Sequence, residues 1–265
     1  MGRTPQNAAT SLKAASAKQA VAFRVFSRAA LPYVTAMAYR LHYAPDNASL
    51  IIRLALELAE VPFETLLVDR RVSAQHSADF RALNPQGQIP ALETPDGPLF
   101  ETGAILCWLS ERHAELGPAP GTALRGRFLS WLFMISNTLH PALRQTFYAD
   151  RFIAADLMQD LRHGLQTEIR RALDLLNIEA ARGDVMGASP LTVLDIYVGA
   201  CLRWLRLYPV DKPGLTDLEP WPNLSNICLQ LDAHPACARV AAAEGLGPHP
   251  FSAPDLPTPP EGSAT

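Results

Sequence analysis

Acidic residues are missing from the first part of this 265-residue chain, because no Asp or Glu precedes Asp46. Five Lys or Arg residues lie before Met37, in a segment rich in Ala and Ser. A basic, acid-free segment of this kind is typical of a mitochondrial transit peptide. A start codon assigned too early, with Met37 as the true start, explains the same pattern, and we favour it. Residues 1–36 are therefore expected to be a leader that is disordered or not native. The expected location is the cytoplasm, or the mitochondrion if the transit peptide is genuine.

Long apolar runs and paired cysteine motifs are also missing. No segment approaches the ~18 consecutive apolar residues of a membrane-spanning helix, so no membrane association is expected. The four cysteines show no Cys-x-x-Cys or metal-ligand spacing, so we expect no metal site and reduced, cytosolic thiols. Removing the five basic residues before Met37 takes the formal net charge from −3 to −8. This acidic balance argues against nucleic acid as a partner.

The segment from residue 39 to residue 116 carries an alternation of strand and helix signals. Period-two patterns and a Gly-containing turn indicate strands, and apolar residues spaced four apart indicate helices. The predicted order is β-α-β-α-β-β-α. The elements are 39–45 (strand and turn), 46–61 (helix), 62–70 (strand), 73–83 (short helix or turn), 89–100 (two strands joined at Asp96-Gly97) and 101–116 (helix).

The chain beyond residue 121 reads as helical almost throughout, with no convincing strand. Thr192 followed by Asp195 predicts a helix start. At this spacing, the side chain of each residue can accept a hydrogen bond from the backbone N–H of the other. We therefore predict an α/β domain over residues 37–117 and an all-helical domain over 121–246. The Pro-rich segment 247–265 is predicted to be a disordered tail.

Three motifs carry a family resemblance: "NPQGQIPAL" (84–92), "ETGAIL" (101–106) and "SPLTVLDI" (189–196). Together with the element order, they make residues 38–245 resemble a cytosolic glutathione transferase, most similar in pattern to the bacterial beta class. The resemblance implies a thioredoxin-like α/β N-terminal domain, an all-α C-terminal domain and a homodimer. It also implies conjugation of glutathione, as the thiolate and cosubstrate, to a small electrophile in detoxification.

The resemblance assigns the glutathione site to two of these motifs. An Ile89-Pro90 cis peptide bond would turn the backbone N–H and C=O of Ile89 outward, to pair with the cysteinyl part of glutathione as an added strand. Gln88 lies beside this bend and could bond the ligand's peptide groups. Glu101 and Thr102 stand at a helix start, which favours a carboxylate, so they would hold the γ-glutamyl end. Helix capping alone is the alternative role for this pair.

Thiol activation requires donors that lower a thiol pKa of about 8.5. The beta-class cysteine position is occupied here by Ala48, so mixed-disulfide chemistry has no evident nucleophile. Ser49, with Arg53 four residues later, has the spacing of the theta and delta classes and is the first candidate, with helix capping as its alternative. Tyr43 is the second candidate, although a buried structural role is favoured for it. Asn47 is the third.

The second-substrate pocket is assigned by the resemblance to Asn137 and His140, in "NTLHPALR" (137–144). The electrophile itself is not predicted. Two other functions are compatible with the same fold. One is a binding or regulatory protein without catalysis, which the missing cysteine makes credible. The other is a glutathione-dependent dehalogenase or isomerase, which would regenerate free glutathione.

Overall fold

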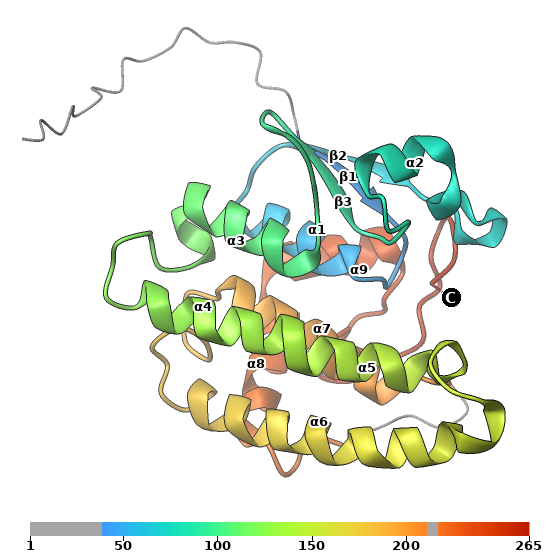
Figure 1. Ribbon diagram of the computed structural model, residues 1–265. Helices are drawn as coiled ribbons and strands as arrows, with labels where there is room; N and C mark the ends of the chain where they lie inside the picture. Colours follow the sequence, from blue (N-terminus) through green and yellow to red (C-terminus); the bar gives the residue numbers. More distant parts are fainter. Residues whose placement is uncertain (1–38, 211–216, 265) are drawn as a thin grey trace, which may run out of the picture. The chain divides into compact units, whose positions relative to one another are not determined.

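The structure is a computed structural model that describes residues 39–210 and 217–264. The leader predicted over residues 1–36 lies outside the described residues. The N-terminal elements are β1 (Tyr39–Tyr43), α1 (Ser49–Leu58), β2 (Phe63–Leu67), α2 (Ala78–Leu83), β3 (Ala91–Thr94), β4 (Gly97–Phe100) and α3 (Thr102–Arg112). The helices that follow are α4 (Arg125–Met134), α5 (His140–Phe147), α6 (Met158–Ala180), α7 (Val193–Leu207), α8 (Pro222–Ala233) and α9 (Pro235–Glu244). The predicted order of a βαβαββα domain and a helical domain is confirmed (Figure 1).

The four strands form one sheet in the order β2-β1-β3-β4. Strand β1 is parallel to β2 and antiparallel to β3, and β3 is antiparallel to β4. Side chains alternate between the faces of a strand. Leu41 and Tyr43 therefore join the main core with α1 and α3, whereas His42 packs on the other face against Phe80 of α2. The sheet thus separates a large core from a small one around Phe80.

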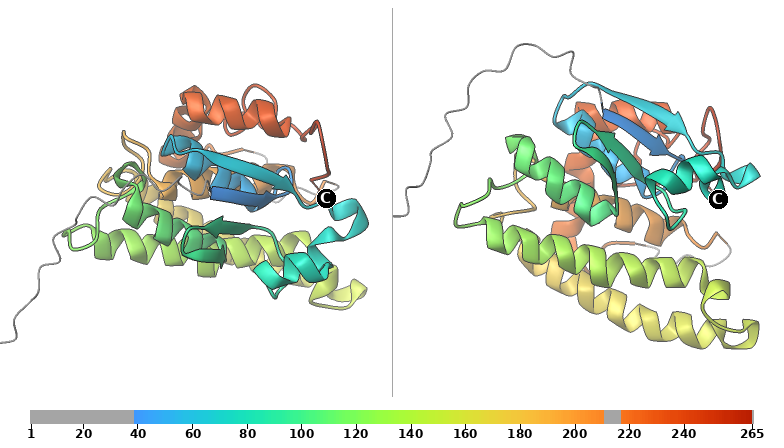
Figure 2. Two further views of the ribbon diagram at one scale, coloured as in Figure 1. Left: turned by 90° about the horizontal axis from the view of Figure 1, so that it is seen from above. Right: turned by 45° about the horizontal axis from the view of Figure 1, so that its top comes forward.

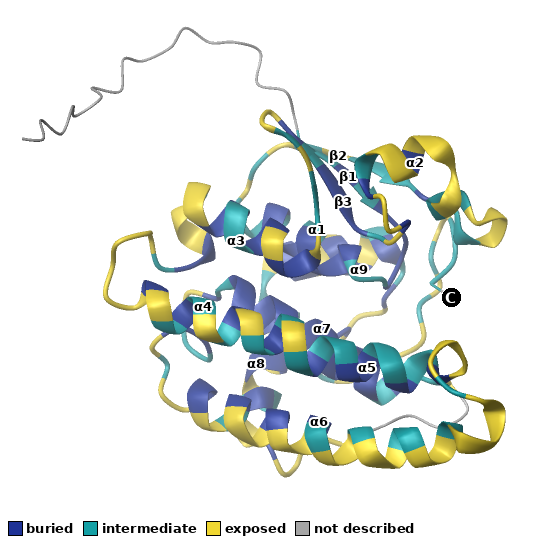
Figure 3. Ribbon diagram, viewed as in Figure 1, coloured by how far each residue is buried: buried dark blue, intermediate teal, exposed yellow. Residues whose placement is uncertain are grey.

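Helix α1 is buried on almost all sides, since it packs against β1, α3, α7 and α9 (Figures 1 and 3). This placement fits the sequence, because the polar residues Ser49, Arg53 and Glu57 lie four apart on one side and the rest of the helix is apolar. The position matters for function, because the residues that precede α1 enter the interior between the two domains.

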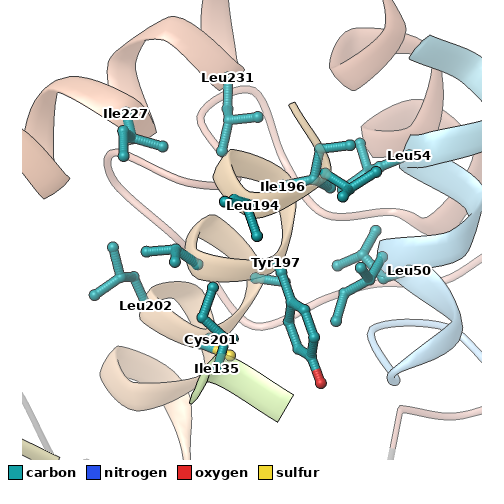
Figure 4. Packing of buried hydrophobic residues seen from close by; sticks show 14 of the residues in the cluster. Leu50, Leu54, Ile135, Leu194, Ile196, Tyr197, Cys201, Leu202, Ile227 and Leu231 are labelled. Carbon is teal, nitrogen blue, oxygen red and sulfur yellow. The ribbon is translucent and has the colours of Figure 1, made fainter. Parts of the chain in front are cut away.

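The helical domain is built around α7, whose residues are nearly all buried (Figure 3). Helix α7 can approach α8 closely at Gly199 because glycine has no side chain. A Cβ at this position would lie 2.2 Å from the Leu231 side chain. Figure 4 shows Leu194, Ile196 and Leu231 packed in this core. The predicted capping box at Thr192 and Asp195 is present at the start of α7. No helix in the described part of the chain is long and apolar enough to cross a membrane.

Helices α4 and α5 form one continuous rod joined by a π-helical turn, Ile135–Leu139 (Figure 1). Helix α6 runs back along α5. A π turn places an extra residue in the helix and is frequent at functional sites. Here it ends at Leu139, two residues before Pro141, whose backbone nitrogen has no hydrogen to donate.

The prediction of a disordered tail is wrong for residues 247–264. Figure 2 shows this red segment running back from α9, and Gly262 packs against Leu67 at the end of β2. Phe251 is fully buried, and Arg203 and Arg206 of α7 donate to backbone carbonyls of the segment. Proline removes backbone donors but leaves carbonyl acceptors. Arginine side chains elsewhere in the chain satisfy those acceptors, which is why composition alone was misleading.

Asp46 joins the two domains through a set of buried hydrogen bonds. Its carboxylate accepts two bonds from Arg203, at 2.9 and 3.0 Å, and both partners are completely buried. Trp204 and Tyr208 also donate to it, at 2.9 and 3.0 Å. A buried carboxylate with four charge-assisted or polar donors is well compensated. These bonds fix the loop between β1 and α1 on helix α7.

Candidate functional site

A pocket of about 610 Å³ lies between the thioredoxin-like domain and the helical domain. We call its two walls the sheet-domain wall and the helical wall. Residues of the sheet-domain wall are Asn47, Ala48, Arg70, Gln75, His76, Asn84, Gln86, Gly87, Gln88, Ile89, Pro90, Glu101, Thr102 and Gly103. Residues of the helical wall include Ser136, Asn137, His140, Pro141, Arg144, Phe147, Tyr148, Arg151, Tyr197, Trp204, Tyr208, Pro209 and Val210. Asp46 and Ala264 also line the pocket.

The bend before β3 forms the middle of the sheet-domain wall. The Ile89-Pro90 bond is cis, as predicted. Gly87 has φ +63° and lies against the backbone of Gln75, so this tight turn requires a residue without a side chain. The Asn84 amide donates to the Gln88 carbonyl at 2.6 Å and holds the bend in place. Among the described residues, nothing hydrogen-bonds the backbone N–H or C=O of Ile89. These two groups remain available to a ligand.

Glu101 and Thr102 line the same wall at the start of α3. Glu101 precedes α3 with φ 71°, a conformation that residues other than glycine rarely adopt. Backbone strain of this kind concentrates at functional sites. The Gln86 amide donates to the Glu101 carboxylate at 2.7 Å. Thr102 is the first residue of α3, where unpaired N–H groups favour an anion.

Ser49 does not line the pocket, which corrects the sequence-based choice of the first catalytic candidate. It is completely buried, and its hydroxyl donates to the Ala44 carbonyl at 3.0 Å and accepts from the Ala44 N–H at 3.2 Å. A hydroxyl carries one proton, and this one is used inside the loop. The serine does not cap the helix either, because the residue at the N-cap is Ala48 and no side chain bonds the first turn.

Tyr43, the second candidate, is also outside the pocket. Its ring is buried under the guanidinium of Arg53, at 5.2 Å, and its hydroxyl donates to Glu261 of the C-terminal segment. Burial, followed by the hydrogen bond to Glu261, raises the pKa of Tyr43 well above its usual value. The placement agrees with the structural alternative that the sequence favoured for this tyrosine.

Asn47 is the third candidate, and of the three it is the one that lines the pocket. Its side-chain amide oxygen, Oδ1, accepts from the Ala48 N–H at 2.8 Å. This bond orients the amide, and its NH₂ group has no partner among the described residues. Asn47 stands just before α1, where the helix dipole adds to a donor that faces an anion.

Asn137 and His140 lie on the helical wall, as the sequence predicted for a cleft. The His140 Nδ1 atom is 2.8 Å from the Tyr197 hydroxyl, and the ring packs against Trp204. Burial and the positive charge of Arg144 lower the pKa of His140 to about 4. His140 is therefore neutral near pH 7. Among the described residues, no group of three or more His, Cys, Asp or Glu is arranged to hold a metal ion.

Comparison with known proteins gives two family matches along the chain. Residues 37–111 match the glutathione S-transferase N-terminal domain, and residues 159–228 match the glutathione S-transferase C-terminal domain. A maleylpyruvate isomerase from Ralstonia sp is 30% identical over 72% of this chain and 91% of its own length. The chain belongs to the glutathione S-transferase family.

Solved structures of the family agree with this assignment. A sphingomonad glutathione S-transferase complexed with glutathione is 27% identical, with a TM-score of 0.65 over 78% of this chain and 100% of that one. A bacterial beta class glutathione S-transferase from Sphingomonas chungbukensis is 26% identical, with a TM-score of 0.64 over 78% of this chain and 98% of that one. The solved structures that are similar to this chain thus include a member of the beta class, which its sequence pattern resembles.

Sequence analysis missed several polar residues that line the pocket of this family member. Arg70, Arg144 and Arg151 were not proposed. A signal existed for Arg144, because it follows His140 by four residues and therefore shares its face of a helix. Ala264 could not be found, because it belongs to the segment predicted to be disordered.

Proposed function

We propose that this protein is a glutathione transferase that binds glutathione on the sheet-domain wall and activates it as the thiolate. The observation that carries the proposal is one pocket lined by Ile89, Thr102 and Asn47. Among the described residues, the backbone N–H and C=O of Ile89 and the side-chain NH₂ of Asn47 have no partner, and Thr102 starts α3. The family's structural relatives include a complex with glutathione. A small electrophile would enter from the helical wall.

The tripeptide would lie extended along the sheet-domain wall. Its cysteinyl N–H and C=O would pair with Ile89, and Gln88 would bond the neighbouring peptide group. Thr102 and the N–H groups of α3 would hold the γ-glutamyl carboxylate, and Glu101 would accept from its ammonium group. The glycyl carboxylate would then face Arg70, at the opposite end of this wall.

Asn47 replaces Ser49 as our proposed thiolate donor. Its amide NH₂ would donate to the glutathione sulfur and stabilise the negative charge more than it stabilises the thiol. A donor of this kind lowers a thiol pKa and keeps the nucleophile charged at neutral pH. Fixed positioning against the electrophile supplies the other part of the rate increase.

The test is a titration with glutathione, followed by calorimetry for binding and by ultraviolet absorbance for the bound thiolate. We expect Asn47→Ala to bind glutathione within about threefold of wild type but to lose most of the thiolate signal at pH 7. A hydrogen bond to a charged group is worth ~1.5 kcal/mol, which corresponds to a rise of about one unit in the pKa of the bound thiol. Ser49→Ala, at the first residue of α1, and Tyr43→Phe, at the last residue of β1, are matched controls, and both should keep the signal.

Three results would separate this proposal from its rivals. Retention of the thiolate in Asn47→Ala and loss in Ser49→Ala would return the role to the serine. Binding without any thiolate in wild type would favour a carrier or regulatory protein. No binding of glutathione would contradict the proposal as a whole.

A glutathione-dependent isomerase is the second candidate, because the 30% identical relative is a maleylpyruvate isomerase. Isomerisation regenerates free glutathione, whereas conjugation consumes it. Measuring glutathione before and after turnover distinguishes the two reactions.

We also propose a homodimer, as the family resemblance implies, and a location in the cytoplasm, or in the mitochondrion if residues 1–36 are a genuine transit peptide. Light scattering that gives the mass of one chain would contradict the dimer.

A further inference from the structure

Three arginines gather where α5 ends, on the side of the pocket away from α3. Arg70 donates to the Tyr148 hydroxyl at 3.3 Å, and the Arg151 guanidinium lies 4.4 Å from the centre of the same ring. Arg144 is one helical turn before Tyr148, and its carbonyl accepts the Tyr148 N–H. All three arginines line the pocket. The guanidinium groups of Arg70 and Arg151 thus meet at Tyr148, and Arg144 adds a third positive charge to the lining of the pocket.

The carboxylates of the pocket do not neutralise this cluster. Asp46 is occupied by Arg203, Trp204 and Tyr208, and Glu101 accepts from Gln86. Within the described ranges, no ion pair joins Arg70, Arg144 or Arg151 to a carboxylate. The nearby His140 adds no positive charge at neutral pH, since its pKa is lowered. The charge at this end comes from the guanidinium groups.

The three arginines have different partners inside the protein. Arg70 also donates to the Ala264 carbonyl and stands on the sheet-domain wall, where the glycyl end of glutathione would reach it. Arg144 and Arg151 have no hydrogen bond to a described residue through their side chains, and their guanidinium groups lie over the rings of Phe152 and Tyr148, respectively. Two guanidinium groups thus remain for a group other than glutathione.

The wall around these arginines can accept a small organic body. Phe147 and Tyr208 lie with ring centres 6.0 Å apart, and both line the pocket together with Val210. A ligand there would place apolar atoms on the rings and an anionic group on the guanidinium forks. Guanidinium groups match the planar geometry of carboxylates and related oxyanions and bind them through paired hydrogen bonds.

We propose that Arg144 and Arg151 form an anion subsite that selects an electrophile bearing a carboxylate or another oxyanion group. The inference rests on the proposed function, because it places this electrophile opposite the glutathione sulfur. The subsite fixes the charged end of the electrophile, while Phe147, Tyr148 and Tyr208 contact its body. A neutral electrophile of the same size has no partner for the two guanidinium groups.

The test compares three glutathione thioethers that differ only at the end of the S-substituent. S-propylglutathione is neutral there, whereas S-(2-carboxyethyl)glutathione and S-(2-sulfoethyl)glutathione carry a carboxylate and a sulfonate. Calorimetry on the full chain should show both charged ligands binding at least ~10-fold tighter than the propyl ligand, as expected for charge-assisted hydrogen bonds. A preference for one of the two anions identifies the oxyanion class.

The double variant Arg144→Gln/Arg151→Gln should reduce this preference to about twofold or less and leave the Kd of glutathione itself within about threefold. Arg171→Gln is the matched control, because Arg171 is an exposed arginine on α6 that pairs with Glu168 outside the pocket. It should keep the full preference. Thermal unfolding of each variant checks that the fold is intact.

Each contrary result has a separate meaning. Equal binding of the three ligands by wild type, or a preference that survives in the double variant, would overturn the anion subsite and leave the transferase proposal standing. Loss of glutathione binding in the double variant would assign the arginines to the tripeptide and also overturn the subsite. Failure of wild type to bind glutathione or any thioether would overturn both proposals.

Discussion

The two walls of the pocket are built from different parts of the chain. On the sheet-domain wall, most of the lining residues come from one stretch, Asn84–Gly103. The glutathione-binding groups that we propose there include the backbone of Ile89 and of the start of α3. On the helical wall, long side chains reach the cavity from α5, from the turn Ala149–Arg151 and from the end of α7. A backbone site suits a ligand that never changes, whereas side chains can be exchanged without altering the fold. The proposed functions of the walls follow this division.

The largest predicted effect comes from breaking the connection between the two domains. Arg203→Met would leave the Asp46 carboxylate buried without its ion pair, so we expect a loss of about 3–5 kcal/mol in the free energy of unfolding. Urea unfolding measures it. Arg171→Met, at an exposed position, should change stability by less than ~0.5 kcal/mol. A loss below ~1 kcal/mol in Arg203→Met would show that the domains are held together by other contacts.

The second prediction concerns the pH dependence of the helical wall. His140 has a folded-state pKa of about 4, below the ~6.5 of an unfolded histidine, so the unfolded state binds more protons between these values. Stability should rise with pH through this window and be lost as pH falls from 6.5 towards 4, by up to ~3 kcal/mol. Urea unfolding of wild type and His140→Gln between pH 4 and pH 7.5 measures the difference.

The comparison with the variant is needed because another buried group acts in the opposite direction. Burial raises the pKa of Glu244 to about 7, which makes stability fall as pH rises towards 7. Subtracting the His140→Gln curve from the wild-type curve removes this contribution. His163→Gln, at an exposed histidine, should reproduce the wild-type curve. A His140→Gln curve parallel to wild type would mean that the histidine is protonated as easily as in the unfolded chain.

The smallest predicted effect concerns glutathione binding on the sheet-domain wall. Thr102→Val keeps the shape of the side chain but removes the hydroxyl proposed to bond the γ-glutamyl carboxylate. We expect the Kd of glutathione to rise about 10-fold, since a hydrogen bond to a charged group is worth ~1.5 kcal/mol or more. Thr122→Val, at an exposed threonine outside the pocket, should leave the Kd unchanged. An unchanged Kd in Thr102→Val would indicate that this residue serves only the helix start.

The sheet-domain wall was largely predictable from the sequence, because local signals determine it. Proline after Ile89 marked the bend, and Glu101-Thr102 marked the helix start. The same reasoning ranked Ser49 first at the start of α1, although Ser49 does not line the pocket and Asn47 does. The Ser49 hydroxyl is held by hydrogen bonds with the backbone of Ala44, which no local pattern reveals.

The helical wall was much less predictable, because it depends on contacts between distant segments. Arg70 and Tyr148 meet although 78 residues separate them, and the Pro-rich segment is ordered by Arg203 and Arg206. Helical periodicity gives the face on which Arg144 lies, but not what packs opposite that face. Side-chain chemistry of this kind becomes visible only when the helices are placed.

A crystal structure of the protein with S-(2-carboxyethyl)glutathione is the most direct test of the proposed roles of the two walls. These roles are glutathione binding on the sheet-domain wall and electrophile binding on the helical wall. We predict a tripeptide paired with the backbone of Ile89, its γ-glutamyl end at Thr102 and its sulfur next to the Asn47 amide. The carboxylate of the substituent should lie on Arg144 and Arg151. A tripeptide bound along the helical wall, or a substituent that points away from both arginines, would contradict the account.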